Sequence, residues 1–366
     1  MKMKKLTALL LTLTLVLGLT ACGSTTTTTS DASESASVSD ASTVAASDDA
    51  SVVADSTESV GTEINMAVLA GPTGIGASEL MAWNDAGTTT NTYNFTVASA
   101  NDDVVAGLTS GEFDIAAVAT NVAANLYQKT SGGVQICALN TYGVLYILEN
   151  GESVQSISDL AGKTIYATGQ GANPEYVLEY LLTENGLTWS TDGTDADVQI
   201  VFMDSESLVA QMASGEIDLC MLPVPAVTSV EMQNSDVRTA LNLTDEWNNL
   251  GVDGTLTMGC VVVRTEFAEA HPEAVEAFLA EYSFSIEAVQ ADVEGAAQLC
   301  EQYGIVAKSA VAAKAIPDCN LCCVVGEEMK SAIEPYYNVL YAANPASIGG
   351  EMPGEDFYFI GESLIG

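Results

Sequence analysis

Apolar residues at helical spacing, followed by a turn and a short apolar run, occur twice along the chain. Residues 104–118 read VVAGLTSGEFDIAAV and residues 208–222 read LVAQMASGEIDLCML, so the two copies lie 104 residues apart. In each copy, apolar residues at i, i+1 and i+4 share one helix face. The Ser-Gly pair is typical of a helix end, because glycine adopts the left-handed conformation at little cost. The run after it is short and apolar, as in a buried strand, so each copy is predicted to form a helix, a turn and a strand.

The segments around the two copies correspond as well. Apolar runs at 95–98 and 198–202 precede the copies, and further strands are expected at 64–69 and 164–167, each followed by a glycine-rich turn and a helix. This order of elements is typical of parallel sheets with right-handed crossovers. Chance similarity between two ordinary helix–strand units is the alternative. The identical positions across the repeat favour two lobes of similar architecture.

The chain is thus predicted to have an α/β fold of two lobes, each an open and mostly parallel sheet flanked by helices. Lobe 1 is expected at 62–145 and lobe 2 at 146–256, while residues 257–366 return to lobe 1 and end in helices. Two hinge crossings near 143–148 and 254–260 join the lobes. Ligands of open α/β sheets bind beyond the carboxyl ends of the strands, where the strand order reverses. We expect the loops after the first and third strands of both lobes to surround one cleft there.

The first 22 residues have the pattern of a targeting segment. Lys2, Lys4 and Lys5 precede an apolar stretch at 6–17 that is too short to span a bilayer. The stretch ends in Leu-Thr-Ala-Cys, which resembles the lipobox of bacterial lipoproteins. This resemblance implies a lipid on Cys22 that anchors the protein to the outer face of the cell membrane, in a bacterium expected to be Gram-positive. A plain secretory signal is the alternative. Residues 23–61 contain only seven small or polar residue types and are predicted to be a disordered tether.

Charge and cysteine content exclude several classes of protein. Only ten Lys and Arg stand against 49 Asp and Glu, and a surface this acidic repels phosphate, so no nucleic-acid partner is expected. Three cysteines within apolar runs are predicted to be buried thiols: Cys137, Cys220 and Cys260. Cys319, Cys322 and Cys323 lack the second Cys or His pair that a zinc site needs, and no cofactor is expected.

Polar residues at two helix starts are interpreted structurally. Asn173 is predicted to be an N-cap, with Pro174 at the first helical position. His271, the only histidine, precedes Pro272 and is expected to cap another helix. No Ser/His/Asp set or metal-ligand cluster appears, so an enzyme is not expected.

Four stretches carry a resemblance to a known family: the lipobox, SGEFDIA, SISDLAGKTI and VVVRTEFAEAHPEAVEAFLAEY. Over about 64–282 the chain resembles the type II solute-binding proteins of ABC importers, in the NMT1-like group of sulfonate, taurine and thiamine-pyrimidine binders. The resemblance implies a monomer that binds a small solute between its lobes and delivers it to a membrane permease. A lipid-anchored receptor for a sensor kinase is the alternative, with an enzyme a third.

By position, the resemblance places the ligand contacts in four loops. They are Gly71, Pro72, Thr73 and Gly74; Thr120 and Asn121; Gly169, Gln170, Gly171 and Asn173; and Pro223 and Pro225. No Lys or Arg falls within these loops, which favours a neutral or weakly charged solute over a sulfonate. Tyr142, Tyr176 and Trp247 are expected near the cleft, where they could stack on a flat heterocycle.

Overall fold

A computed structural model of the chain describes residues 61–252 and 254–361. The targeting segment, Cys22 and nearly all of the predicted tether lie outside the described residues. Within the described part, no helix combines the length and the hydrophobicity needed to cross a bilayer.

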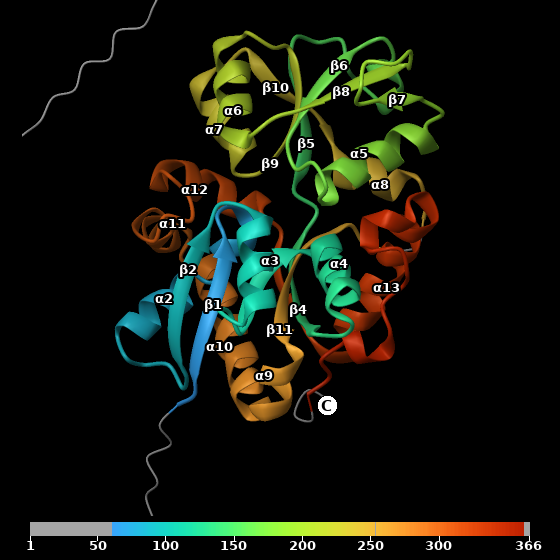
Figure 1. Ribbon diagram of the computed structural model, residues 1–366. Coiled ribbons are helices and arrows are strands. Elements are labelled where there is room, and N and C mark those ends of the chain that lie inside the picture. The colour runs from blue at the N-terminus through green and yellow to red at the C-terminus, as the bar shows by residue number, and fades with distance from the viewer. Residues whose placement is uncertain (1–60, 253, 362–366) are drawn as a thin grey trace, which may run out of the picture. The chain divides into compact units, whose positions relative to one another are not determined.

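The first sheet has the strand order β12-β4-β11-β3-β1-β2 (Figure 1). Its strands are β1 (Glu63–Leu69), β2 (Thr92–Ala98), β3 (Ile115–Ala119), β4 (Val134–Tyr142), β11 (Thr257–Arg264) and β12 (Leu321–Val324). β1 pairs in parallel with β2 and β3, whereas β11 runs antiparallel to both β3 and β4, and β12 runs antiparallel to β4.

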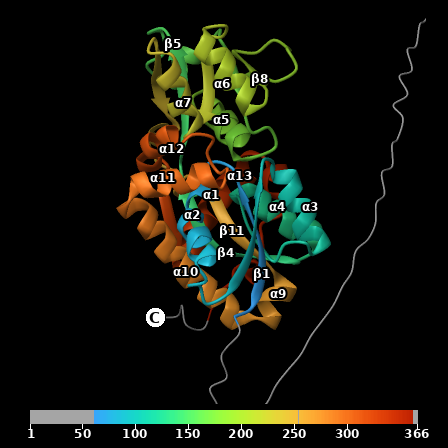
Figure 2. The same ribbon diagram turned by 90° about the vertical axis from the view of Figure 1, so that its left-hand side faces the viewer.

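Helices cover both faces of this sheet. They are α1 (Pro72–Ile75), α2 (Ser78–Asp85), α3 (Asn101–Ser110), α4 (Thr120–Thr130), α9 (Thr265–Ala270), α10 (Pro272–Ala291), α11 (Val293–Gln302), α12 (Ser309–Ala315) and α13 (Gly326–Ala343). Figure 2 shows α2 and α10 on one side of the strands and α3 and α4 on the other. Short 3-10 turns follow at η2 (Ile316–Asp318), η3 (Pro345–Ile348) and η4 (Glu355–Phe357).

The second sheet has the strand order β10-β5-β9-β6-β8-β7. Its strands are β5 (Leu145–Asn150), β6 (Thr164–Ala167), β7 (Trp189–Ser190), β8 (Val198–Phe202), β9 (Leu219–Pro223) and β10 (Val237–Asn242). The helices of this lobe are η1 (Ile157–Leu160), α5 (Asn173–Glu184), α6 (Ser205–Ser214), α7 (Ala226–Gln233) and α8 (Leu243–Asn249). β6 pairs in parallel with β8 and β9, and β5 runs antiparallel to β9 and β10.

The two sheets repeat one arrangement, which confirms the predicted two-lobed α/β fold. Both sheets are mixed, and the first is not mostly parallel: three of its five strand pairings are antiparallel, mainly because β11 enters from the other lobe between β3 and β4 in the opposite direction. In each sheet the strand after the duplicated helix, β3 or β9, lies between the first strand and one antiparallel strand. That antiparallel strand, β11 or β5, enters directly from the other lobe. Helices α3 and α6 end at Gly111 and Gly215, whose φ angles of 78° and 75° are left-handed, as the Ser-Gly pairs predict. The chain passes between the sheets at residues 143–144 and again between α8 and β11.

Two expected helix caps differ in detail. Helix α5 begins at Asn173 itself, with Ala172 as its N-cap, because the Asn173 side chain bonds to the other lobe instead of to its own helix. His271 does occupy the N-cap position of α10, but its side chain makes no capping hydrogen bond and its ring lies 5.0 Å from that of Phe267.

The structure confirms the predicted burial of three thiols. Cys137, Cys220 and Cys260 are completely covered. Burial raises the pKa of each thiol, since a thiolate has no solvation there.

The repeat also contains an aspartate whose environment differs between the two copies. In the first, Asp114 is 6% exposed, and its carboxylate accepts hydrogen bonds from the Asn65 backbone N–H (2.9 Å), the Asn65 side chain (3.0 Å) and Arg264 (2.8 Å). These bonds join β1, β3 and β11 at one end of the first sheet. The corresponding Asp218 of the second copy is exposed.

Asp114→Ala should therefore lower the free energy of unfolding by about 2–4 kcal/mol, because Arg264 loses a partly buried partner and two donors of Asn65 lose their acceptor. Asp218→Ala, the matched control at the same position of the repeat, should change it by less than about 0.5 kcal/mol. Urea unfolding followed by circular dichroism measures both, and equal effects of the two variants would contradict the assigned role of Asp114.

Candidate functional site

The four predicted loops all follow carboxyl ends of strands. Gly71–Gly76 follows β1 and contains α1, Thr120 and Asn121 begin α4 directly after β3, Gly169–Asn173 follows β6, and Pro223 and Pro225 lie at the end of β9. Hydrogen bonds to Asn173 bring the second and third of these loops together.

Asn173, at the start of α5 in lobe 2, is completely buried against lobe 1. Its Nδ2 donates to Thr120 Oγ1 (2.6 Å) and to the backbone carbonyl of Met258 (2.8 Å). Its Oδ1 accepts from the Asn121 backbone N–H (3.2 Å) and from the Tyr336 hydroxyl (3.1 Å). One amide from lobe 2 is thus held by groups from β11, the start of α4 and α13.

Asn121 and Thr120 complete this contact from lobe 1. Asn121 Nδ2 lies 3.3 Å from the carbonyl of Gly171, and Thr120 Oγ1 donates to the Thr257 carbonyl at 2.8 Å. Asn121 Oδ1 and Thr257 Oγ1 are both buried without a hydrogen-bond partner among the described residues. Two polar atoms at the meeting point of the lobes therefore have unused hydrogen-bonding capacity.

The glycine-rich turn after β1 approaches the same part of β11. Asn140 Nδ2 donates to the Thr73 carbonyl (3.1 Å) and to the Tyr282 hydroxyl (3.0 Å). Thr73 packs so tightly on Gly259 that a Cβ there would lie 2.4 Å from Thr73 Cγ2. Since Met258, the neighbouring residue, bonds to Asn173, the Gly71–Gly76 turn and the Gly169–Asn173 loop reach adjacent positions of one strand.

The remaining loop residues lie closer to the surface. Gln170 and Gly171 are exposed, Gly169 and Pro225 are half-buried, and the Gly171 N–H donates to Glu175. The N–H of Val224, between the two prolines, donates to the Val144 carbonyl at 3.0 Å, so the fourth loop lies beside the crossing from β4 to β5.

The expected stacking residues do not share one environment. Trp247 is completely buried, its Nε1 donates to the Gly254 carbonyl (2.9 Å), and its ring lies 5.1 Å from that of Tyr180 and 5.6 Å from that of Tyr336. Protein side chains cover the whole indole in this conformation. Tyr142 is half-buried at the end of β4, where burial raises its hydroxyl pKa.

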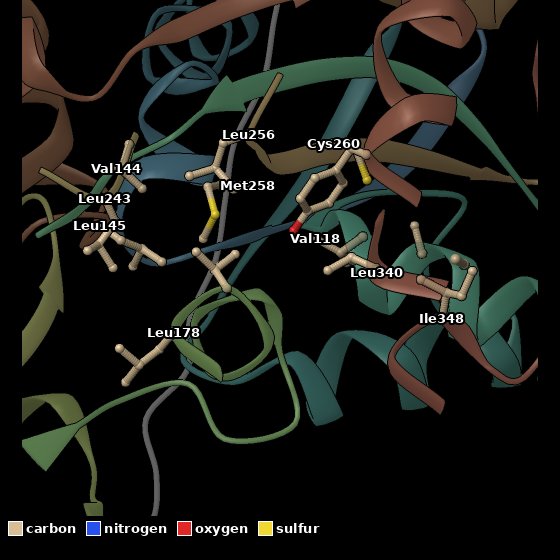
Figure 3. Close-up of a cluster of buried hydrophobic side chains, with 14 of the residues drawn as sticks. Val118, Val144, Leu145, Leu178, Leu243, Leu256, Met258, Cys260, Leu340 and Ile348 are labelled. Atoms are coloured by element: carbon tan, nitrogen blue, oxygen red, sulfur yellow. The ribbon is translucent and has the colours of Figure 1, made fainter. Parts of the chain in front are cut away.

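An apolar core continues from one lobe to the other around these polar groups. Figure 3 shows Val118 of β3, Leu178 of α5 and Leu340 of α13 among its members, with Val144 and Leu256 from the two crossings. The hydrogen bonds of Asn173 therefore lie at the border of a region from which water is excluded, where unpaired polar groups are costly.

Sequence reasoning missed two tyrosines of α13 that bind these loops. Tyr336 donates to Asn173, and Tyr337 donates to the Thr120 carbonyl at 2.7 Å. Both side chains are fully buried. Adjacent tyrosines within an amphipathic helix were the available signal, because a buried tyrosine hydroxyl usually has a hydrogen-bond partner.

A separate groove of about 1370 Å³ lies between α5 and α13. Tyr176, Glu179 and Tyr180 of α5 line it, with Trp189 of β7 and Glu334 of α13. Glu179 is only 8% exposed. Desolvation, with a smaller contribution from Glu175, raises the pKa of its carboxyl to about 7.

The fold and the facing loops define the class of protein: a two-lobed, periplasmic-binding-type α/β fold. Residues 134–296 match the model of the family described as NMT1/THI5 like. The match agrees with the family resemblance recognised from the sequence and confirms it.

Solved structures with the same fold come from several organisms. A structure of an ABC transporter from Parabacteroides distasonis has a TM-score of 0.66 at 21% identity and covers 81% of this chain and 98% of its own. The periplasmic aliphatic sulphonate binding protein of Escherichia coli has a TM-score of 0.62 at 15% identity, covering 78% and 94%. The ligand binding component of an ABC-type import system from Staphylococcus aureus has a TM-score of 0.62 at 14% identity, covering 83% and 97%.

Among curated proteins, a binding protein of Brucella abortus is 26% identical over 205 residues. The match covers 56% of this chain and 58% of the relative, so the chain spans little more than half of that protein's length.

The raised pKa of Glu179 predicts a pH-dependent cost to stability. Below about pH 4.5 the carboxyl is protonated in both folded and unfolded states, and between about 4.5 and 7 only the unfolded state releases the proton, so stability falls as pH rises. Glu179→Gln should remove this loss and increase stability by about 1–3 kcal/mol at pH 8, with much less effect at pH 4.5.

Urea unfolding at the two pH values measures the difference. Glu206→Gln, an exposed glutamate at the start of α6, is the control and should show no comparable gain at pH 8. An equal effect of Glu179→Gln at both pH values would contradict the assigned environment.

Proposed function

We propose that this protein is a lipid-anchored, extracytoplasmic solute-binding protein that captures a small molecule between its lobes and delivers it to an ABC importer. The observation that carries the proposal is the meeting of loops from both lobes at Asn173. Thr120 and Asn121 of lobe 1 bond to it directly, and the Gly71–Gly76 turn reaches the same strand. The fold and family comparisons above support the same function.

The groups at this meeting point favour a neutral or weakly charged solute with hydrogen-bond donors. Amides and hydroxyls supply most of the polar atoms, and no Lys or Arg lies in the four loops. Asn121 Oδ1 accepts no hydrogen bond from the described residues, so it suits an N–H of the solute. A nitrogen heterocycle combines such donors with a flat face, against which the ring of Tyr142 would stack.

Opening and closing of the lobes provides the route for the solute. The chain crosses between the sheets only twice in the described residues, at 143–144 and between α8 and β11, and rotation about these segments separates the loops. Opening breaks the hydrogen bonds between the Asn173 side chain and the other lobe and releases its amide to bind a solute. A solute that bonds to both lobes then shifts the population towards closure.

A bound solute should raise the melting temperature in proportion to the logarithm of its concentration, because it binds only the folded state. Thermal shift with thiamine precursors, flavins, nucleobases, sulfonates and amino acids identifies the class. For the solute that binds, Asn121→Ala and Asn173→Ala should weaken affinity at least about tenfold, as expected from the loss of a buried hydrogen bond.

Asn185→Ala is the matched control, since Asn185 lies exposed at the other end of α5 and bonds only within its helix. Wild-type affinity in both Asn121→Ala and Asn173→Ala would remove these loops from the site. If no compound class shifts the melting temperature, the transport function loses its support.

The anchor is tested separately. Cys22→Ser should move the protein from the membrane fraction to the medium and abolish its labelling by radioactive palmitate, because a serine accepts no thioether-linked lipid. Thr25→Ser, in the same segment, should remain membrane-bound and labelled. Retention of Cys22→Ser on the membrane would show that something other than lipid at this residue holds the protein there.

A further inference from the structure

The groove between α5 and α13 lies along the later turns of α5, beyond the Asn173 end that joins the lobes. Tyr176, Glu179 and Tyr180 are spaced i, i+3 and i+4, so they share one face of the helix, and all three line the groove. Its volume of about 1370 Å³ exceeds the range of about 300–1000 Å³ common for small-molecule sites. The groove is therefore large enough for a small organic molecule.

Glu179 is a buried carboxylate without a partner. The residue is more than nine-tenths covered, its carboxylate oxygens keep contact with the groove, and neither oxygen has a hydrogen-bond or ion-pair partner among the described residues. None of the described residues lining the groove is Lys, Arg or His. On the α13 wall, Glu334 lies 4.0 Å from Lys330, so that carboxylate is already paired. A buried carboxylate is costly unless a positive group accompanies it, and the groove leaves that place to a ligand.

Aromatic side chains line the same groove. Tyr176, Tyr180 and Trp189 all line the groove, and Trp189 Nε1 donates to Thr183 Oγ1 at 3.2 Å, which helps hold the indole in place. Ring faces attract organic cations, whereas a hard metal ion needs several oxygen ligands. Glu184, which is exposed, also lines the groove, and the combination of these carboxylates with three rings suits an alkylated ammonium better than a metal.

We propose that this groove is a second binding site, specific for an organic cation of the quaternary ammonium type. The Glu179 carboxylate balances the positive charge, and the rings of Tyr176, Tyr180 and Trp189 pack against the alkyl groups. Because α5 belongs to lobe 2 and α13 follows the return of the chain to lobe 1, the bound cation contacts both lobes. The site is separate from the loops around Asn173 and goes beyond the proposed solute-binding function.

Choline and its neutral carbon isostere, 3,3-dimethylbutan-1-ol, test the proposal because they differ in charge but hardly in shape. Titration calorimetry of the full-length protein at pH 8 should show one choline bound per chain and an affinity for the isostere at least about tenfold lower. Equal affinities for the two compounds, or no choline binding up to about 10 mM, would overturn the proposal.

Variants locate the site. Glu179→Gln should lose at least about tenfold in choline affinity but leave the isostere unaffected, and Tyr176→Leu should weaken choline more than the isostere. The control Glu206→Gln and the loop variant Asn121→Ala should both bind choline like the wild type. Wild-type affinity in Glu179→Gln would overturn the assignment. Loss of choline binding in Asn121→Ala would place choline in the inter-lobe site instead, which also overturns it.

Discussion

The arrangement of the two lobes depends on how the side-chain amide of Asn173 is satisfied. The residue has no exposed surface, and its hydrogen-bond partners all come from lobe 1 or from α13. A buried amide left without partners costs about 1–3 kcal/mol. Separation of the lobes must therefore return this amide to water or give it a new partner. A polar contact of this kind favours one closed arrangement and can still be exchanged for a solute.

Helix α5 carries two buried polar residues with opposite environments. Asn173, at its first turn, has its amide fully occupied, whereas Glu179, two turns later, faces a groove with no cation on its walls among the described residues. The Asn173 side chain connects the lobes at a low electrostatic cost because an amide is neutral. Burial of Glu179 raises the pKa of its carboxyl, because the low-polarity surroundings disfavour the charged form. One helix thus presents a neutral polar contact at one end and an unbalanced charge along its side.

Much of the fold was predictable because it is encoded locally and twice. The SGE repeats at 110–112 and 214–216 end equivalent helices, and the strand–helix order implies parallel pairing with crossovers. The loops at Thr120 and Asn173 could be placed together because each follows the carboxyl end of a strand, and the two lobes were expected to face each other across one cleft. Trp247 shows where this reasoning ends, since its position near a crossing did not reveal that Tyr180 and Tyr336 enclose it.

By itself, the sequence determined the two-lobed α/β plan and the ends of the duplicated helices, since these follow from hydrophobic periodicity and from glycine. Tertiary structure alone decided which polar groups meet. Asn173 contacts Tyr336 across 163 positions of the chain, and Tyr337 reaches Thr120 across 217. Contacts this distant leave no periodic trace, because they depend on the angle at which whole helices pack and not on the spacing of neighbouring residues.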